Sequence, residues 1–160
     1  MHPTKNDMAT ETRSAVCKLL NQRLADLIDL QLQAKQAHWN VKGPHFIGLH
    51  KLFDEVSEMV SEHIDEVAER ITALGGTAEG TVAAVSKRTE IAPYPLNITG
   101  GRDHVDKLSS ALAAAGKSVR SGIDQADELK DKDTADLLTA VSRDLDQKLW
   151  FVEAHLQFDN

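Results

Sequence analysis

The sequence contains a single cysteine, few aromatic residues and no long apolar run among its 160 residues. Because Cys17 has no cysteine partner in the chain, an internal disulfide and a cysteine-ligated zinc or iron–sulfur site are excluded. No stretch approaches the roughly 18 consecutive apolar residues of a membrane span, and the polar opening residues lack the apolar core of a signal peptide. These absences predict a cytoplasmic protein without a membrane partner.

The sequence also has fewer positively than negatively charged residues. The chain has 25 Asp and Glu against 18 Lys and Arg, so its formal net charge is -7. This balance opposes a chain-wide attraction to nucleic acid and suits the binding of metal cations. A length of 160 residues, with 41% hydrophobic and 27% charged residues, is typical of one globular domain.

Apolar residues recur at spacings of three and four along four long stretches, and β-branched runs bounded by turns are missing. This pattern predicts an all-α protein. The first helix is expected to begin after Thr10 or Thr12 and to stop at Gly43-Pro44, and the second to run from near Pro44 to Gly75-Gly76. The apolar stripes of the third and fourth helices run from Val105 to Ala126 and from Leu138 to Leu156.

The connection between the second and third predicted helices, residues 77 to about 101, is too long for a simple turn. It has room for one short helix in TVAAVSKR. Two hairpins joined by one long crossover is the connectivity of a ferritin-like bundle, although bundles without chemistry share it. The first helix is apolar on more than one side, because Leu19, Leu30 and Leu32 lie off its main stripe, and this favours a subunit interface.

One face of the second predicted helix carries four residues of the kind that bind metals. At about 100° per residue, they fall within a sector of about 100°. The four are His50, Asp54, Asp65 and Glu69. A solvated acidic face would look similar, but His50 lies within the stripe and His38 arrives from the first helix close to the connecting turn.

The spacing along this helix decides how a metal ion could be held. Asp54 and Asp65 are separated by roughly 16 Å on an ideal helix, so they cannot bind one ion within one chain. If two copies pack antiparallel about a two-fold axis near residues 59 and 60, His50 and Asp54 of one copy face Asp65 and Glu69 of the other. Imidazole and carboxylate together accept Fe(II), Zn(II) or Mn(II). The sequence contains no Glu-x-x-His element, HExxH motif, P-loop or Rossmann glycine pattern.

Three segments then point to a known family: QAHWNVKGPHFIGLHKLFDE, DEVAERITALGG and DTADLLTAVSRDLDQKLWFVE. Together they resemble the Dps family, the DNA-binding proteins from starved cells or miniferritins, over about residues 6–155. The family signature is a histidine, twelve residues to a second histidine, four to an aspartate, eleven to another aspartate and four to a glutamate. The matching residues are His38, His50, Asp54, Asp65 and Glu69.

This resemblance implies a ferritin-like domain over residues 15–160, a flexible N-terminal tail over residues 1–14 and assembly into a hollow homo-dodecamer. It also implies a ferroxidase that converts Fe(II) to Fe(III), with hydrogen peroxide preferred over oxygen, and that stores ferric oxide in the shell. The five signature residues would be the catalytic iron ligands, shared across a two-fold interface, with Zn2+ or Mn2+ as competing ions. Such chemistry would protect DNA and the cell from oxidative stress.

Four further residues match family positions with a suggested role. Trp39 and Trp150 resemble tryptophans near the site that intercept oxidising equivalents, although core aromatics would also explain them. Asp133 and Asp136 match acidic residues of pores on the three-fold axes. Stabilisation of a helix N-terminus would account for both aspartates as well.

The sequence offers little for direct DNA binding. The N-terminal segment has only Lys5 and Arg13 as permanent cations, offset by Asp7 and Glu11, and the chain ends without a basic extension. Weak contacts with DNA that add up over twelve copies of the chain remain an alternative. Two other interpretations remain: a nucleoid-compacting, DNA-binding protein with a vestigial or zinc-holding metal site, and a helical interaction bundle with no metal chemistry.

Overall fold

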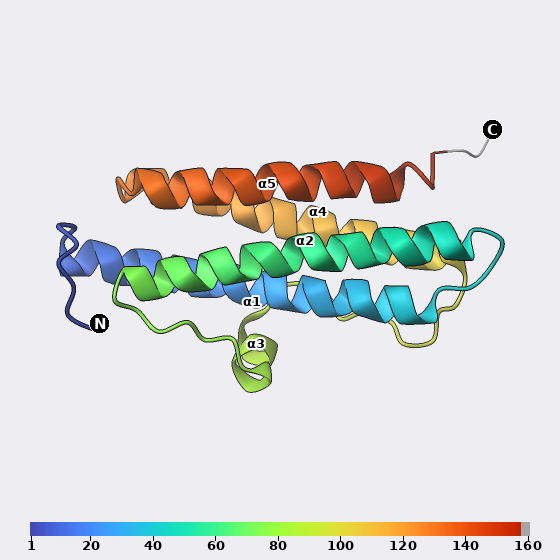
Figure 1. Ribbon diagram of the computed structural model, residues 1–160, viewed down its shortest axis with the longest axis horizontal. Coiled ribbons are helices and arrows are strands. Elements are labelled where there is room, and N and C mark those ends of the chain that lie inside the picture. Colours follow the sequence, from blue (N-terminus) through green and yellow to red (C-terminus); the bar gives the residue numbers. More distant parts are fainter. Residues whose placement is uncertain (158–160) are drawn as a thin grey trace.

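The computed structural model describes residues 1–157, and this part of the chain is helical without a β-strand (Figure 1). Four long helices and one short helix form, as the sequence predicts. They are α1 (Thr10–Asn40), α2 (Phe46–Ala73), α3 (Val82–Arg88), α4 (Gly101–Glu128) and α5 (Lys132–Glu153). Helix α1 pairs with α2 and α4 with α5, and contacts of α1 with α4 and of α2 with α5 close the bundle. No helix in residues 1–157 is both long and apolar enough to span a bilayer.

The helix starts differ from the sequence expectation at α1. Neither Thr10 nor Thr12 is the N-cap, because the helix follows Ala9 and has no side-chain cap. The Thr10 hydroxyl accepts a hydrogen bond from Arg13 at 3.1 Å, so it does not cap the backbone. Helix α1 therefore includes residues 10–14, which the resemblance had placed in the tail, while residues 158–160 of the expected domain lie outside the described part.

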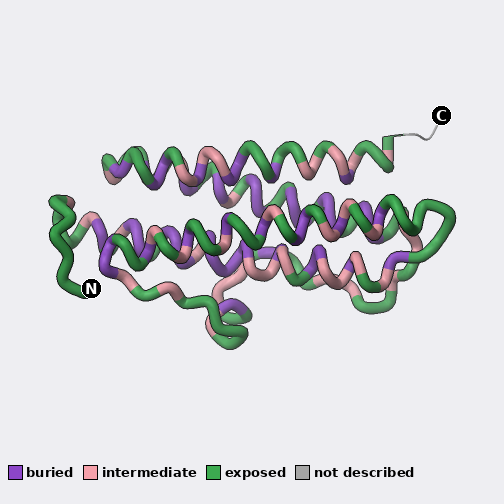
Figure 2. The backbone as a smooth tube through the Cα atoms, in the orientation of Figure 1, coloured by how far each residue is buried: buried purple, intermediate pink, exposed green. Residues whose placement is uncertain are grey.

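Large aliphatic residues from the four long helices fill the core. Each of the following is fully or almost fully buried: Leu20, Leu24, Leu27, Phe53, Leu108, Leu112, Leu138 and Leu145. Purple segments of the tube in Figure 2 accordingly face one another inside the bundle, and green segments lie outside. Leu19 and Leu30 are also buried within the chain, because α1 contacts α2, α3 and α4; only Leu32 of that trio stays exposed, at 52%.

The crossover between α2 and α4 runs along the flank of α1. Polar side chains of α1 hold it there: Gln22 donates to the Arg88 carbonyl at 2.9 Å, and Gln33 donates to the Ala92 carbonyl at 3.0 Å. Near the end of α1, the Lys42 amide donates to the Thr99 carbonyl at 2.9 Å. Two glutamines of α1, one buried and one half-buried, and the backbone just after the helix thus satisfy carbonyl groups of a long irregular segment.

The N-terminal segment lies against the end of α2. The His2 amide donates to the Gly75 carbonyl at 2.7 Å, and Arg13 donates to the Leu74 carbonyl at 2.9 Å and to the Met8 carbonyl at 3.1 Å. Gly75 has a φ of +84°, and a Cβ there would lie 2.6 Å from the His2 carbonyl oxygen. Glycine is therefore required at this turn both for its backbone conformation and for the close approach of the segment.

Candidate metal centre

His38 and His50 form a reciprocal pair across the α1–α2 hairpin. His38 Nδ1 lies 2.7 Å from the His50 carbonyl oxygen, and His50 Nδ1 lies 2.8 Å from the His38 carbonyl oxygen. The two rings stack at 3.7 Å between centroids, with 22° between their planes. A carbonyl oxygen can only accept, so each Nδ1 carries a hydrogen, and in the neutral ring Nε2 is the nitrogen with the lone pair. That tautomer is the one a metal ion requires, with the second nitrogen held by the backbone.

The turn between α1 and α2 creates this pair. Gly43 has a φ of +118°, a value that L residues rarely adopt, and with Pro44 it reverses the chain before α2 begins at Phe46. His38 and His50, twelve positions apart in sequence, therefore lie opposite each other on adjacent helices. The Phe46 ring covers His50, with 5.1 Å between ring centroids.

Asp54 lies one helical turn beyond His50 and is paired with Lys35 of α1. The Lys35 ammonium contacts Asp54 Oδ1. This hydrogen bond lowers the pKa of Asp54 below its usual range, and the two neighbouring histidines act in the same direction. Asp54 is thus held as an anion, while a cation occupies one of its two oxygens.

The sequence pattern did not single out Lys35. A lysine three residues before His38 shares its helical face, and this spacing is the only signal that could have identified it. A lysine on a half-exposed helix face usually has no special role, so the contact across the hairpin becomes visible only in three dimensions. Lys35 is the functional candidate that sequence reasoning missed.

Asp65 and Glu69 lie farther along α2 and do not join this group. Both are exposed, and within residues 1–157 neither carboxylate makes a hydrogen bond or an ion pair. Eleven residues of helix separate Asp65 from Asp54, about 16 Å at 1.5 Å per residue. In the described chain no three His, Cys, Asp or Glu residues are arranged to hold a metal ion. The fold pairs His38 with His50 and places Asp54 near enough for both histidines to lower its pKa, and it leaves Asp65 and Glu69 apart.

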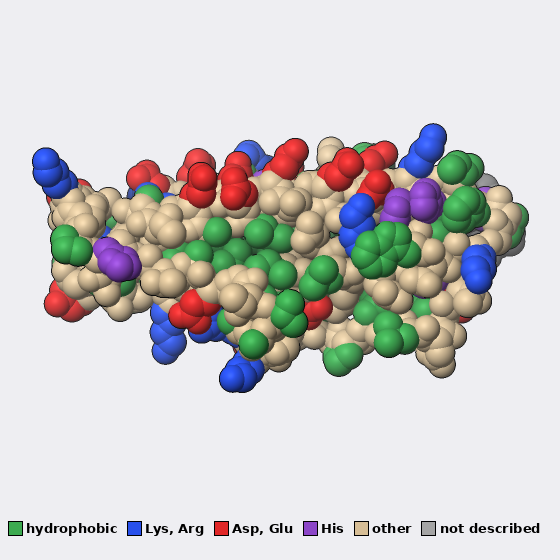
Figure 3. All heavy atoms as spheres, turned by 60° about the horizontal axis from the view of Figure 1, so that its bottom comes forward, with side chains coloured by type: hydrophobic (Ala, Val, Ile, Leu, Met, Phe, Trp, Pro, Cys, Tyr) green, Lys and Arg blue, Asp and Glu red, His purple; other side chains and the backbone are tan. Residues whose placement is uncertain are grey.

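An apolar patch adjoins the histidine pair. It consists of Leu32, Trp39, Phe46 and Ile47, all large and exposed. Figure 3 shows hydrophobic side chains next to histidine at one end of this face and a row of acidic side chains along its edge. A patch of this kind at the rim of a potential site is typical of a protein–protein interface.

Neither tryptophan is a core residue of the single chain. Trp39, next to His38, is 67% exposed, and Trp150 of α5 is 60% exposed. Trp150 lies beside Gly48 and Leu52 of α2 in a shallow surface depression. The interpretation as buried core aromatics is therefore wrong for the chain by itself.

The two candidate pore aspartates lie near the start of α5, Asp133 in its first turn and Asp136 in the next. Asp133 and Asp136 are both exposed, and Asp133 lies 3.9 Å from Arg70. The N-cap of the helix is Asp131, which accepts from the Thr134 amide at 3.1 Å and pairs with Arg70 at 2.8 Å. Helix capping thus belongs to Asp131, and the other two carboxylates remain on the surface.

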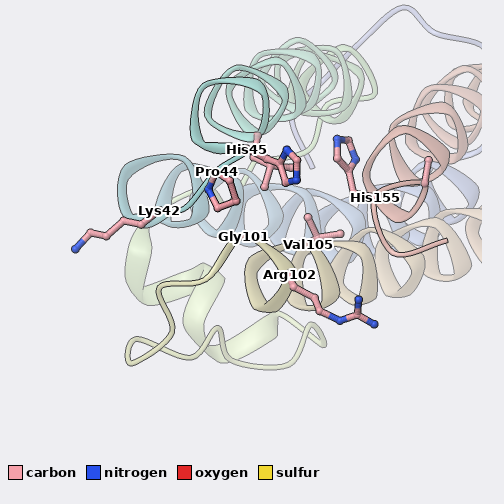
Figure 4. Close-up of a pocket in the computed structure, with 9 residues that line it drawn as sticks. Lys42, Pro44, His45, Gly101, Arg102, Val105 and His155 are labelled. Carbon is pink, nitrogen blue, oxygen red and sulfur yellow. The ribbon is translucent and has the colours of Figure 1, made fainter. Parts of the chain in front are cut away.

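A separate cavity of about 760 Å³ opens at the end of the bundle beyond the α1–α2 turn. Figure 4 shows His45 and His155 on its two sides, while the side chains of Lys42 and Arg102 extend away from it. None of the histidine–carboxylate group lines this cavity. Its polar groups do not converge on a common point, so concavity alone does not make it the chemical site.

Two helical hairpins joined by a long crossover, with histidines and carboxylates on α1 and α2, define a ferritin-like four-helix bundle. Comparison with known proteins agrees: residues 17–159 match the ferritin-like domain family. The DNA protection during starvation protein of Agrobacterium fabrum (strain C58) is 47% identical over 98% of this chain and 96% of its own. The chain belongs to the Dps family.

Solved structures of Dps proteins share the fold closely. A tetragonal form of Mycobacterium smegmatis Dps superposes with a TM-score of 0.92 and 35% identity over 96% of this chain and 94% of that chain. Dps from Microbacterium arborescens in the high iron form superposes with a TM-score of 0.87 and 31% identity over 96% and 98% of the two chains.

Proposed function

We propose that this protein is a ferroxidase and iron store: it oxidises Fe(II) to Fe(III) at a site shared by two copies and keeps the ferric product inside a dodecameric shell. The observation that carries the proposal is the His38–His50 pair, in which each Nδ1 lies against the backbone carbonyl of the other residue, with Asp54 one helical turn beyond His50. Membership of the Dps family supports it, as does the high iron form of the related Microbacterium protein.

The remaining ligands would come from a second copy. Asp65 and Glu69 lie about 16 Å or more along α2 from Asp54, and an antiparallel α2 of a partner would bring its own pair to the histidines. The exposed patch of Leu32, Trp39, Phe46 and Ile47 would be covered by the same contact. The protein would then be a homo-oligomer in which no monomer has a complete site.

The ligand set suits the oxidation of iron. Two neutral imidazoles and three carboxylates place three negative charges around the substrate ion, and these favour Fe(III) over Fe(II). Asp54 would use Oδ2 toward iron, because Oδ1 contacts Lys35. The imidazoles would bind through Nε2, held in position by the reciprocal backbone contacts of Nδ1.

Hydrogen peroxide is the proposed oxidant. Two Fe(II) ions supply two electrons to one peroxide, which takes up two protons, breaks its O–O bond and leaves as two water molecules. One Fe(II) ion acting alone would supply a single electron and release hydroxyl radical. Pairwise oxidation thus removes iron and peroxide together, and exposed Asp133 and Asp136 would attract Fe(II) toward the shell.

Protection of DNA would follow from this chemistry more than from binding through the N-terminal segment. Arg13, one of the two permanent cations there, is only 7% exposed and donates to the carbonyls of Leu74 and Met8. The His2 amide is bonded to Gly75. Besides the N-terminal amine, Lys5 is then the exposed permanent cation of this segment. This is too little positive charge for strong attraction to DNA phosphates.

Stopped-flow oxidation tests the proposal. The protein is loaded with Fe(II) under anaerobic conditions and mixed with hydrogen peroxide or with oxygen, and ferric absorbance is followed beside native mass determination. We expect a faster ferric signal with peroxide and a soluble, iron-loaded oligomer. Oxidation no faster than in buffer, or a monomer that binds no iron, would refute the proposed function.

A further inference from the structure

Tyr94 and His104 form a hydrogen-bonded pair that the proposed iron chemistry does not use. The Tyr94 hydroxyl lies 2.8 Å from His104 Nδ1, and the two rings are nearly parallel, with 6.0 Å between centroids. Tyr94 belongs to the crossover and His104 to the first turn of α4. Tyr94 is also the only tyrosine of the chain, so its chemistry can be observed without interference from another phenol.

Burial fixes the protonation of both partners. His104 is only 1% exposed, and desolvation lowers its pKa, partly offset by Asp103 and the Ile98 backbone. Desolvation raises the pKa of Tyr94 well above its usual value. The phenol is therefore protonated and the imidazole neutral at ordinary pH, so the Tyr94 O–H donates to the Nδ1 lone pair.

This arrangement is suited to one-electron chemistry. A phenol that loses an electron becomes a very strong acid, and it must release its proton at once. His104 Nδ1, buried and at hydrogen-bond distance from the half-buried Tyr94, can take that proton. Trp39 and Trp150 are exposed by 67% and 60%, and within residues 1–157 neither indole donates a hydrogen bond to a buried base.

The crossover that carries Tyr94 follows the same helix, α1, that carries His38. The crossover follows α1 from Gln33, which holds Ala92, to Lys42, which holds Thr99, and His38 lies between these two points on the helix. Tyr94 and His38 are thus separated by about one helix thickness and one to two turns, on the order of 10–15 Å. Side chains exchange electrons over such separations.

We propose that Tyr94, with His104 as its proton acceptor, is an internal one-electron donor that quenches hydroxyl radical or an equivalent one-electron oxidant formed when iron meets peroxide. Tyr94 gives up one electron and its O–H bond breaks. The proton moves to His104 Nδ1, where a new N–H bond forms, and hydroxyl radical is reduced to hydroxide. One Fe(II) then returns an electron and becomes Fe(III), while the proton moves back to the phenol. This guarding role, the quenching of radicals during iron oxidation, rests on the proposed ferroxidase function. The one-electron oxidation of the Tyr94–His104 pair can be tested without iron.

The first experiment uses an oxidant that needs no iron. Azide radicals made by pulse radiolysis oxidise the full-length protein, and the tyrosyl radical is followed by its absorption and by electron paramagnetic resonance. Wild-type protein should yield a tyrosyl signal, and Tyr94→Phe should yield none. His104→Asn keeps an acceptor oxygen near the position of Nδ1 but cannot take a proton, so radical formation should fall by about 10- to 100-fold. His155→Asn, at an exposed histidine, is the matched control for His104→Asn and should leave the tyrosyl yield unchanged.

The second experiment adds Fe(II) and then excess peroxide, with freeze-quench detection and spin trapping of hydroxyl radical. Wild-type protein should show the same tyrosyl signal, and Tyr94→Phe should release more trapped radical at an unchanged rate of iron oxidation. If wild-type protein gives no tyrosyl signal under radiolysis, Tyr94 and His104 are not a one-electron donor and its proton acceptor, whatever the iron site does. A normal radiolysis signal with no radical during active iron oxidation overturns the guarding role. If iron is not oxidised at all, the guarding role falls with the proposed function, while radiolysis still decides the chemistry of the pair.

Discussion

Replacing Lys35 by methionine tests how the candidate site holds Asp54. The lysine contacts Asp54 Oδ1, and the two side chains are 32% and 34% exposed. Ion pairs of such exposure contribute about 0.2–1 kcal/mol. Fe(II) bound at Oδ2 repels the ammonium on Oδ1 and weakens this ion pair, so the ion loses up to about that much binding free energy. Lys35→Met should therefore tighten Fe(II) binding by about 1.5- to 5-fold.

Anaerobic isothermal titration with Fe(II) measures this change, and Lys18→Met, on an exposed part of the same helix, serves as the control. Unfolding in denaturant should shift by no more than about 1 kcal/mol, since only a partly exposed pair is lost. Unchanged or weaker Fe(II) binding in Lys35→Met would show that the lysine orients the carboxylate and does not compete with iron.

The same variant should alter the acid sensitivity of the fold. Lys35 lowers the pKa of Asp54, so the pair stabilises the folded state above the unfolded aspartate pKa of about 3.9 and loses that contribution as pH falls through the lower folded value. The stability difference between wild type and Lys35→Met should therefore be full near neutral pH and shrink in acid below about pH 4. A difference that grows in acid would contradict the assigned pair.

Three further variants probe the site and the fold. Asp65→Ala should slow iron oxidation by roughly tenfold or more without dissociating the oligomer. Asp124→Ala, at an exposed position of α4, should leave the oxidation rate unchanged. Stopped-flow kinetics measures the rate, and native mass determination measures the oligomeric state. Asp131→Ala removes the α5 cap and the partner of Arg70 and should cost about 2–4 kcal/mol in denaturant unfolding, against less than about 0.5 kcal/mol for exposed Asp133→Ala. Phe53→Ala empties a fully buried core position and should cost about 3–5 kcal/mol; a loss below about 1 kcal/mol would mean that the core is not packed as described.

Much of the fold could be predicted from sequence because its helices carry long apolar stripes. The sequence also placed His38 close to the turn before the second helix, and the hairpin does pair it with His50. What the pattern could not reveal depends on contacts between distant segments. The Thr10 hydroxyl is engaged by Arg13 and not by the helix backbone, and the burial of Leu19 and Leu30 follows from the contacts of α1 with three other helices.

The polar contacts across elements were equally hidden. A lysine on a helix face gives no sign that it reaches Asp54 on the next helix. Tyr94 lies in a segment without periodicity, so its bond to His104 could not be inferred before the crossover was placed against α1. Periodicity reports which side of a helix is buried, but it does not report which polar side chains meet there.

Mixing two inactive variants tests most directly whether two copies share the iron site. One variant carries His50→Ala and Asp54→Ala, and the other carries Asp65→Ala and Glu69→Ala; each should oxidise Fe(II) poorly by itself. If they are co-assembled at random, half of the pairs are mixed and each mixed pair regains one of its two sites, so about a quarter of wild-type activity should return. A mixed assembly of confirmed composition that stays as inactive as its parents would show that the residues do not meet across two chains.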